Sequence, residues 1–142
     1  MKTSARNQYV GTITRIESGP VTTEVDIEIA GGHVLAATLT TTSATRMNLR
    51  KGQQALALIK ASSVVLVTDI DGYLLSARNQ LAGTVSRVDR GAVSTVVGLS
   101  LSGGQEVIAT VTNDAADDLA LHTGQAATAI FKAYQVFVAV KA

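Results

Sequence analysis

Cysteine is absent from the 142-residue sequence, and aromatic and charged residues are scarce. The absence of cysteine excludes disulfides, thiolate metal sites and cysteine nucleophiles. Aromatic residues make up 4% and charged residues 16% of the chain, against roughly 25% charged residues in ordinary soluble domains. With 12 Lys and Arg against 11 Asp and Glu, no broad field attracts nucleic acid or an anionic membrane. So few charges favour burial of part of the surface against other copies of the chain.

No segment has the pattern of a secretion signal or a transmembrane helix. Residues 1–7 contain no apolar stretch of the kind found in signal peptides. The longest all-aliphatic run, Val64-Val65-Leu66-Val67, is far too short to span a bilayer. We therefore expect a soluble cytoplasmic protein with no membrane partner.

The chain is an internal duplication with an offset of 72 residues. Ser4-Ala5-Arg6-Asn7-Gln8 aligns with Ser76-Ala77-Arg78-Asn79-Gln80. Without a gap, residues 4–68 and 76–140 share 26 identities in 65 positions, with many glycines in register. We predict two domains, residues 1–69 and 70–142, with a turn at Asp71-Gly72 in the connector.

Each repeat shows the alternation of apolar and polar residues that is typical of β-strands with one solvent-exposed face. In residues 21–29, aliphatic residues and one threonine share one face, and polar residues occupy the other. The glycine pairs at 31–32 and 103–104 predict tight hairpin turns. The other strands of the first repeat are expected at residues 7–17, 34–41, 54–60 and 64–68.

One short helix is expected in each repeat between its third and fourth strands. In the first repeat it would span residues 44–49, capped by Ser43 or Thr42, and in the second residues 115–121, capped by Asp114. The predicted fold class is all-β, with tandem OB-like five-stranded antiparallel barrels and one short helix per repeat.

The sequence offers no constellation typical of an enzyme. Its two histidines, His33 and His122, fall in predicted loops and are not equivalent in the repeats. A cluster at Asp114, Asp117 and Asp118 has no acidic counterpart in the first repeat, and it fits a solvated helix start. No Walker-type glycine loop and no Ser/His/Asp order is present. We expect no enzymatic activity and no metal-cation site.

Nucleic acid is the usual cargo of OB barrels, and its sites need a basic groove with aromatic stacking platforms. The five aromatic residues are not paired between the repeats, and the basic residues are scattered. We therefore expect no nucleic-acid partner.

Hydrogen-bond donors do recur in both repeats. Ser4 and Arg6 match Ser76 and Arg78, and further matched donors are Thr40 with Thr112 and Lys60-Ala61 with Lys132-Ala133. A dianion with four oxygens only accepts hydrogen bonds, so it needs hydroxyl, amide and cationic donors. The alternative is that Ser-Ala-Arg-Asn is a strand start held by Asn7 or Asn79, with Arg6 and Lys60 as solvated charges.

The joint order of these motifs resembles the molbindin family, also called Mop or TOBE domains. The resemblance rests on Ser-Ala-Arg-Asn-Gln, Gly-Thr, Gly-x-Val, a glycine pair, Thr and Lys-Ala at matching intervals in both repeats. It implies an OB-like barrel, assembly of tandem units into a trimer, and oxyanion sites at contacts between modules. The ligand would be molybdate or tungstate, with no organic cofactor.

The resemblance also implies which residues hold the oxyanion. One set comprises Ser4, Arg6, Thr40, Lys60, Ala61 and Ser62, and the other comprises Ser76, Arg78, Thr112, Lys132, Ala133 and Tyr134. A second class of site on the threefold axis would involve Val21, Thr22, Val93 and Ser94. Because the small Ser62 is matched by the large Tyr134, the two sets are expected to differ in shape.

The family has storage and sensing members, and the sequence favours the first role. No helix-turn-helix segment precedes the first Ser-Ala-Arg-Asn, and no ATPase is present, as in free-standing tandem molbindins. The expected function is intracellular storage or buffering of molybdate. The alternative is a molybdate-sensing module that acts on a partner such as a transporter or a transcription regulator.

Overall fold

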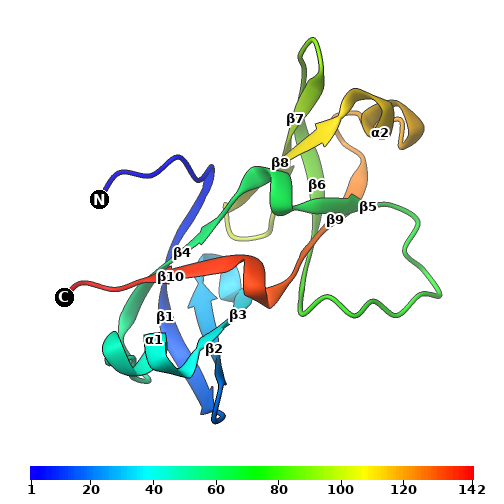
Figure 1. The fold of residues 1–142 in the computed structure, drawn as a ribbon. Coiled ribbons are helices and arrows are strands. Elements are labelled where there is room, and N and C mark those ends of the chain that lie inside the picture. The colour runs from blue at the N-terminus through cyan, green and yellow to red at the C-terminus, as the bar shows by residue number, and fades with distance from the viewer.

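The computed structural model describes all residues 1–142 and contains two five-stranded antiparallel sheets (Figure 1). The first repeat contains β1 (Asn7–Ser18), β2 (Thr22–Ile29), β3 (Val34–Thr40), α1 (Thr41–Arg46), β4 (Gln54–Ile59) and β5 (Val65–Val67). The second contains β6 (Asn79–Arg90), β7 (Ser94–Ser100), β8 (Glu106–Thr112), α2 (Asn113–Asp118), β9 (Ala126–Phe131) and β10 (Val136–Ala139). Three 3-10 turns complete the chain: η1 (Ala30–Gly32), η2 (Ala61–Ser63) and η3 (Ala133–Gln135). No helix is long and apolar enough to cross a membrane.

The predicted class, tandem OB-like barrels with five strands and one short helix each, is confirmed. The strand orders are β10-β4-β1-β2-β3 and β5-β9-β6-β7-β8. The two edge strands of the first sheet, β10 and β3, contact each other, as do β5 and β8 of the second. Each sheet is therefore curled into a partly closed barrel. The two α-helices lie at opposite ends of the molecule (Figure 1).

The barrels exchange their fifth strands, which differs from the expectation that each repeat forms a barrel alone. Strand β10 of the second repeat pairs with β4, with Val136 opposite Ile59. Strand β5 of the first repeat pairs with β9, with Val65 opposite Ile130. Since β5 and β10 occupy equivalent positions in the two repeats, either strand offers the same backbone partners to either barrel. The exchange links the two barrels into one unit.

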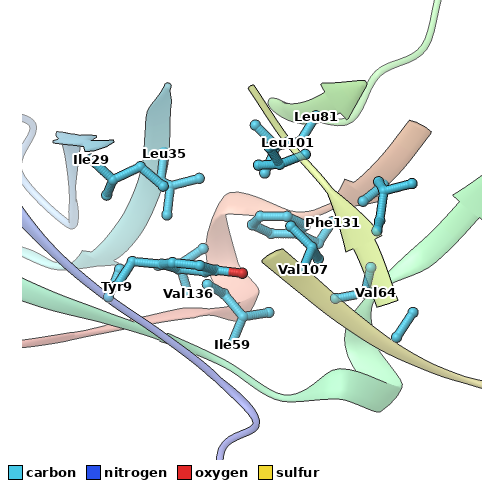
Figure 2. Close-up of a cluster of buried hydrophobic side chains, with 14 of the residues drawn as sticks. Tyr9, Ile29, Leu35, Ile59, Val64, Leu81, Leu101, Val107, Phe131 and Val136 are labelled. Carbon is cyan, nitrogen blue, oxygen red and sulfur yellow. The ribbon is translucent and has the colours of Figure 1, made fainter. Parts of the chain in front are cut away.

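A single hydrophobic core runs through both barrels. Its 23 buried residues come from both repeats. Figure 2 shows a close-up of buried hydrophobic side chains, in which 14 residues are drawn. Tyr9, Ile59 and Val136 lie beside Phe131 and Val107 in that view (Figure 2). Burial of these side chains is the main favourable term in folding. Each five-stranded unit is small, and sharing one core with its neighbour compensates for its limited interior.

Two buried asparagines fasten the start of each repeat to the other repeat. The Asn79 amide exchanges two hydrogen bonds with the backbone of Ala36, at 2.8 and 2.9 Å. The Asn7 amide does the same with Ile108, at 2.7 and 2.8 Å. Ala36 and Ile108 lie on the edge strands β3 and β8, so the asparagines satisfy backbone groups that have no neighbouring strand on that side.

The hairpin turns predicted at the glycine pairs are present, and they contact each other. All four glycines have positive φ, between 77° and 89°. Residues other than glycine rarely adopt this backbone conformation. A Cβ atom at Gly31 would lie 2.5 Å from the backbone oxygen of Ser102. His33 Nε2 lies 2.7 Å from that same oxygen. His33 is therefore part of a structural contact between the repeats.

The helix boundaries and caps differ from those predicted. Helix α1 begins at Thr41 and its N-cap is Thr40, whose hydroxyl accepts a hydrogen bond from the Ser43 amide. Helix α2 begins at Asn113 and is capped in the same way by Thr112. The predicted caps Ser43, Thr42 and Asp114 lie inside the helices, because the hydroxyl-bearing residue that ends the preceding strand already satisfies the first free amides.

Candidate oxyanion-binding groove

A groove of about 600 Å³ lies where the two repeats meet. The turn η3, which follows β9, packs against β3 of the other repeat. The segment before β6 reaches the same place because Asn79 is fastened to Ala36 on β3. The residues that line it are drawn from both repeats, so the groove is a product of the docking between them.

The groove gathers five of the six residues predicted for the second set. These residues are Ser76, Arg78, Lys132, Ala133 and Tyr134. The first repeat contributes Glu24 from β2, Thr38 from β3 and Ser63 from η2. Residues of the first repeat therefore join the predicted second set, because a strand of one repeat faces the donors of the other.

The sequence reasoning missed Glu24, Thr38 and Ser63. Thr38 carried a usable signal, because it is identical to Thr110 at the 72-residue offset. Glu24 carried no such signal, since its counterpart is Val96. The alternation along β2 predicted that Glu24 lies on the solvent-facing side of the strand, and the Glu24 side chain is only partly buried.

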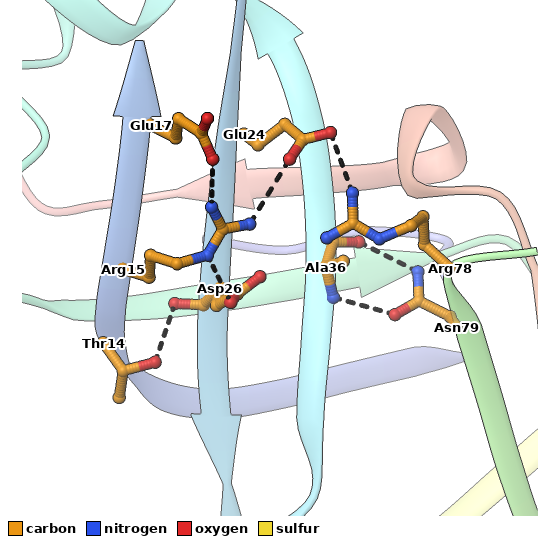
Figure 3. Close-up of polar contacts among 8 residues, drawn as sticks. All are labelled: Thr14, Arg15, Glu17, Glu24, Asp26, Ala36, Arg78 and Asn79. Atoms are coloured by element: carbon orange, nitrogen blue, oxygen red, sulfur yellow. Dashed lines mark hydrogen bonds and ion pairs between the residues drawn. The ribbon is translucent and has the colours of Figure 1, made fainter.

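Glu24 lies between two arginines, as Figure 3 shows. Arg78 Nη1 donates to Glu24 Oε1 at 2.8 Å, and Arg15 Nη2 donates to Glu24 Oε2 at 3.3 Å. The hydrogen bond from Arg78, and next that from Arg15, lowers the pKa of the Glu24 carboxyl. Hydrogen bonds to Asp26, Glu24 and Glu17 in turn raise the pKa of Arg15. Arg15, Glu24 and Arg78 form one ion-pair chain across the repeat boundary.

Lys132 differs from Arg78 in having no anionic partner. Its ammonium group makes no ion pair or hydrogen bond to a carboxylate, and its side chain is exposed. The groove therefore holds two cationic groups, Arg78 and Lys132, and one carboxylate, Glu24. The Ser76 and Thr38 hydroxyls add neutral donors on its walls.

The first predicted set has the same pattern of exposure as the second but forms no ion pair. Ser4, Arg6, Lys60 and Ser62 are exposed, and Ala61 is buried. The turn η2, which begins at Ala61, packs against β8 of the second repeat, so this set also lies at the contact between repeats. Neither the guanidinium of Arg6 nor the ammonium of Lys60 forms an ion pair.

Thr40 and Thr112 do not line the groove, although both were predicted as ligands. Each hydroxyl accepts a hydrogen bond from a helix amide, at 3.1 Å in both cases. Thr38, two residues before Thr40 on β3, lines the groove in its place. In the isolated chain the structure thus assigns Thr40 and Thr112 a helix-capping role.

The residues predicted for the threefold axis lie apart from the groove. Val21 and Val93 precede β2 and β7 and are 75% and 82% exposed, so the alternation that put Val21 on the buried face was wrong at its first residue. Thr22 and Ser94 begin those strands and are half-buried. The four residues do not meet within one chain, because Val21 lies beside α1 and Val93 beside α2.

The remaining side chains include two histidines and several carboxylates. No group of three His, Cys, Asp or Glu residues is placed to hold a metal ion. His122 Nδ1 lies 2.9 Å from the backbone oxygen of Ala120, in the loop after α2. The groove has donors and charges but no base paired with a nucleophile.

The fold defines a class of small modules made of paired OB-like barrels, with a donor-lined groove at the contact between the repeats. The chain belongs to the TOBE-domain family, whose model matches residues 3–66 and 75–138. The two matches correspond to the two repeats. They leave outside only the termini and the connector.

Three relatives illustrate the range of the family. The chain is 61% identical over 141 residues to the molybdenum transport protein ModE of Herbaspirillum seropedicae, and 42% identical over 139 residues to the molybdenum-pterin-binding protein MopA of Rhodobacter capsulatus. These matches cover 99% and 98% of this chain but 52% of each relative, so the chain spans about half the length of these curated relatives. A crystal structure of the cytoplasmic molybdate-binding protein ModG with molybdate bound matches 99% of this chain and all of ModG, with 45% identity and a TM-score of 0.96.

Proposed function

We propose that the chain binds molybdate and tungstate in the grooves between its repeats. The observation that carries the proposal is the convergence of Ser76, Arg78 and Lys132, three recurring donors, on one groove. A tetrahedral dianion accepts hydrogen bonds only, and cationic groups offset its charge. Arginine supplies a planar fork and lysine a point charge, which together suit such an ion.

The likeness to ModG supports this ligand. ModG carries molybdate in its crystal structure, and it matches this chain over its full length with 45% identity. The matched fold and the repeated donors make the same ligand class the simplest occupant of these grooves. We infer binding and buffering of the ion in the cytoplasm, where ModG resides, and no turnover of it.

We also propose that the binding unit is a trimer of chains of this kind. The first set, with Ser4, Arg6 and Lys60, is open to solvent in one chain, and a neighbouring copy would enclose it. The residues proposed for the threefold axis, Val21 and Val93 among them, are also exposed. Threefold assembly would bring three copies of each together. Light scattering at micromolar concentration tests this, and a monomer with or without molybdate would contradict it.

The decisive experiment is calorimetric titration of the apo protein with molybdate, tungstate, sulfate and phosphate. We expect saturable binding of molybdate and tungstate, which share charge and shape. Sulfate and phosphate are the reference anions, because a site that attracted any anion would bind all four alike. Equal weak binding of all four ions, or no binding, would overturn the proposed function.

A second candidate function is sensing of the ion on behalf of a partner. The observation that favours it is the 61% identity to ModE of Herbaspirillum seropedicae, of which this chain matches about half. A sensor must change conformation when it binds, whereas a store need not. Hydrogen exchange with and without molybdate separates the two roles: protection limited to the grooves indicates storage, and protection that extends to surfaces far from them indicates sensing.

A further inference from the structure

The two matched sets of donors differ in charge because of one residue. Glu24 forms an ion pair with Arg78 across the repeat boundary at 2.8 Å. The equivalent of Arg78 is Arg6, and the equivalent of Glu24 is Val96, which carries no charge. The groove of Arg78 and Lys132 thus carries one negative and two positive charges, a net charge of +1, whereas neither Arg6 nor Lys60 is paired with a carboxylate. The duplication makes this a difference between otherwise matched sites.

We propose that Glu24 is an internal competitor for Arg78: its carboxylate occupies Nη1 of the guanidinium that an oxyanion would bind, and it thereby weakens binding by one of the two donor sets. The inference rests on the proposed function. A carboxylate and a tetrahedral oxyanion use the same guanidinium donors. An incoming dianion must therefore compete with Glu24 for Arg78 Nη1, and it must also bear the repulsion of the carboxylate.

The structure provides a second position for the displaced carboxylate. The other oxygen of Glu24 already accepts a hydrogen bond from Arg15 at 3.3 Å, so Glu24 keeps a cationic partner after it leaves Arg78. Glu24 and Arg78 are both partly exposed, at 38% and 46% of their side chains. The exchange therefore needs only side-chain rotation and leaves the strands in place. Arg6 has no carboxylate partner, so binding at Arg6 needs no such exchange.

The test compares Glu24→Gln with a matched control in the same ion-pair cluster. Glu24→Gln keeps the shape and removes the charge, and it should tighten molybdate binding at one class of sites by about tenfold, with unchanged stoichiometry. Glu17→Gln removes the same charge from a residue that contacts Arg15 and not Arg78. We expect its affinity to stay within about twofold of the parent, as for a screened surface charge. Circular dichroism and thermal unfolding check that both variants fold.

A double-mutant cycle shows whether Glu24 acts through Arg78. In an Arg78→Ala background, Glu24→Gln should lose most of its effect on molybdate affinity, because the guanidinium for which Glu24 competes has been removed. Weaker or unaltered binding by Glu24→Gln, beside normal binding by the parent, would overturn this inference alone, since it would mean that Glu24 orients Arg78 or is neutral. A parent that binds no oxyanion would overturn the proposed function, and this inference with it.

Discussion

Asn7 pairs with Ile108 through both ends of its side-chain amide, although the two residues are 101 positions apart. The Ile108 N–H donates to Asn7 Oδ1 at 2.7 Å, and Asn7 Nδ2 donates to the Ile108 carbonyl at 2.8 Å. Asn7 is 2% exposed. Its replacement by alanine would leave two buried backbone groups without partners, at about 1–3 kcal/mol each. We expect Asn7→Ala to lower the free energy of unfolding by about 2–6 kcal/mol in urea denaturation.

The neighbouring Gln8 provides the control for Asn7. Its amide also donates to a backbone carbonyl, that of Ala5, but this contact is exposed and local. Gln8→Ala should change the free energy of unfolding by less than about 0.5 kcal/mol. Equal stability of the two variants would show that the amide clamp does not hold the repeats together.

Tyr9 should make the protein sensitive to alkaline pH. Burial, and next the charge of Glu106, raises the pKa of the Tyr9 hydroxyl, which donates to the Glu106 carbonyl at 2.7 Å. Above pH about 10 the unfolded chain releases this proton and the folded chain retains it. The free energy of unfolding should therefore fall as pH rises from about 10 toward the folded pKa, and it should not recover.

Urea denaturation of the parent protein and of two tyrosine variants between pH 8 and 11 measures this effect. Tyr9→Phe cannot release the proton, so its stability should decline less steeply than that of the parent. Tyr73 is 75% exposed, and Tyr73→Phe should retain the parent slope. If Tyr9→Phe and the parent declined in parallel, the alkaline loss would come from other groups.

Thr112 was predicted as an oxyanion ligand, but as the N-cap of α2 it should contribute to the stability of the fold. Thr112→Val keeps the shape but removes the hydroxyl that accepts from the Ala115 amide, and it should cost about 1 kcal/mol. Thr112→Ser should restore most of this, because serine caps as well as threonine does. Thermal unfolding of the two variants checks the cap. If Thr112→Val abolished molybdate binding at unchanged stability, Thr112 would be a ligand after all.

The duplication and the side-chain alternation predicted most of the secondary structure. The hairpin at Gly31-Gly32 was predictable because positive φ strongly favours glycine, and the apolar face of β2 was predictable because its alternation is regular from Thr23 onward. Both are local properties, so a sequence contains them directly. The convergence of Ser76, Arg78 and Lys132 was anticipated from their recurrence and from the family resemblance.

The strand exchange, the caps and the role of Glu24 were beyond the reach of the sequence. Strands β5 and β10 are equivalent in the two repeats, and no local pattern decides which barrel each completes. A run of four hydroxyl residues from Thr40 offers several caps of similar quality, so the actual one depends on where β3 ends. The pairing of Glu24 with Arg78 spans 54 residues, and it exists only because the repeats dock face to face.

Four single variants should separate the two proposed classes of oxyanion site. Arg78→Ala and Lys132→Ala should weaken molybdate binding at one class, and Arg6→Ala and Lys60→Ala at the other. Each removes a charge-assisted hydrogen bond of about 1.5–3 kcal/mol, which corresponds to a tenfold to hundredfold loss at the affected class. Calorimetric titration measures the affinity and the stoichiometry of each class.

The difference in affinity loss between the two arginine variants is a sharper test than the size of either loss. Arg78 is already paired with Glu24 while Arg6 has no partner, so Arg78→Ala should cost less affinity than Arg6→Ala. Lys51 is an exposed cation outside the groove, and Lys51→Ala controls for the general effect of removing one positive charge. If all four variants bind like Lys51→Ala, then Arg6, Arg78, Lys60 and Lys132 are solvated charges and the ligands lie elsewhere. If only one pair loses affinity, the duplication has kept a single working site.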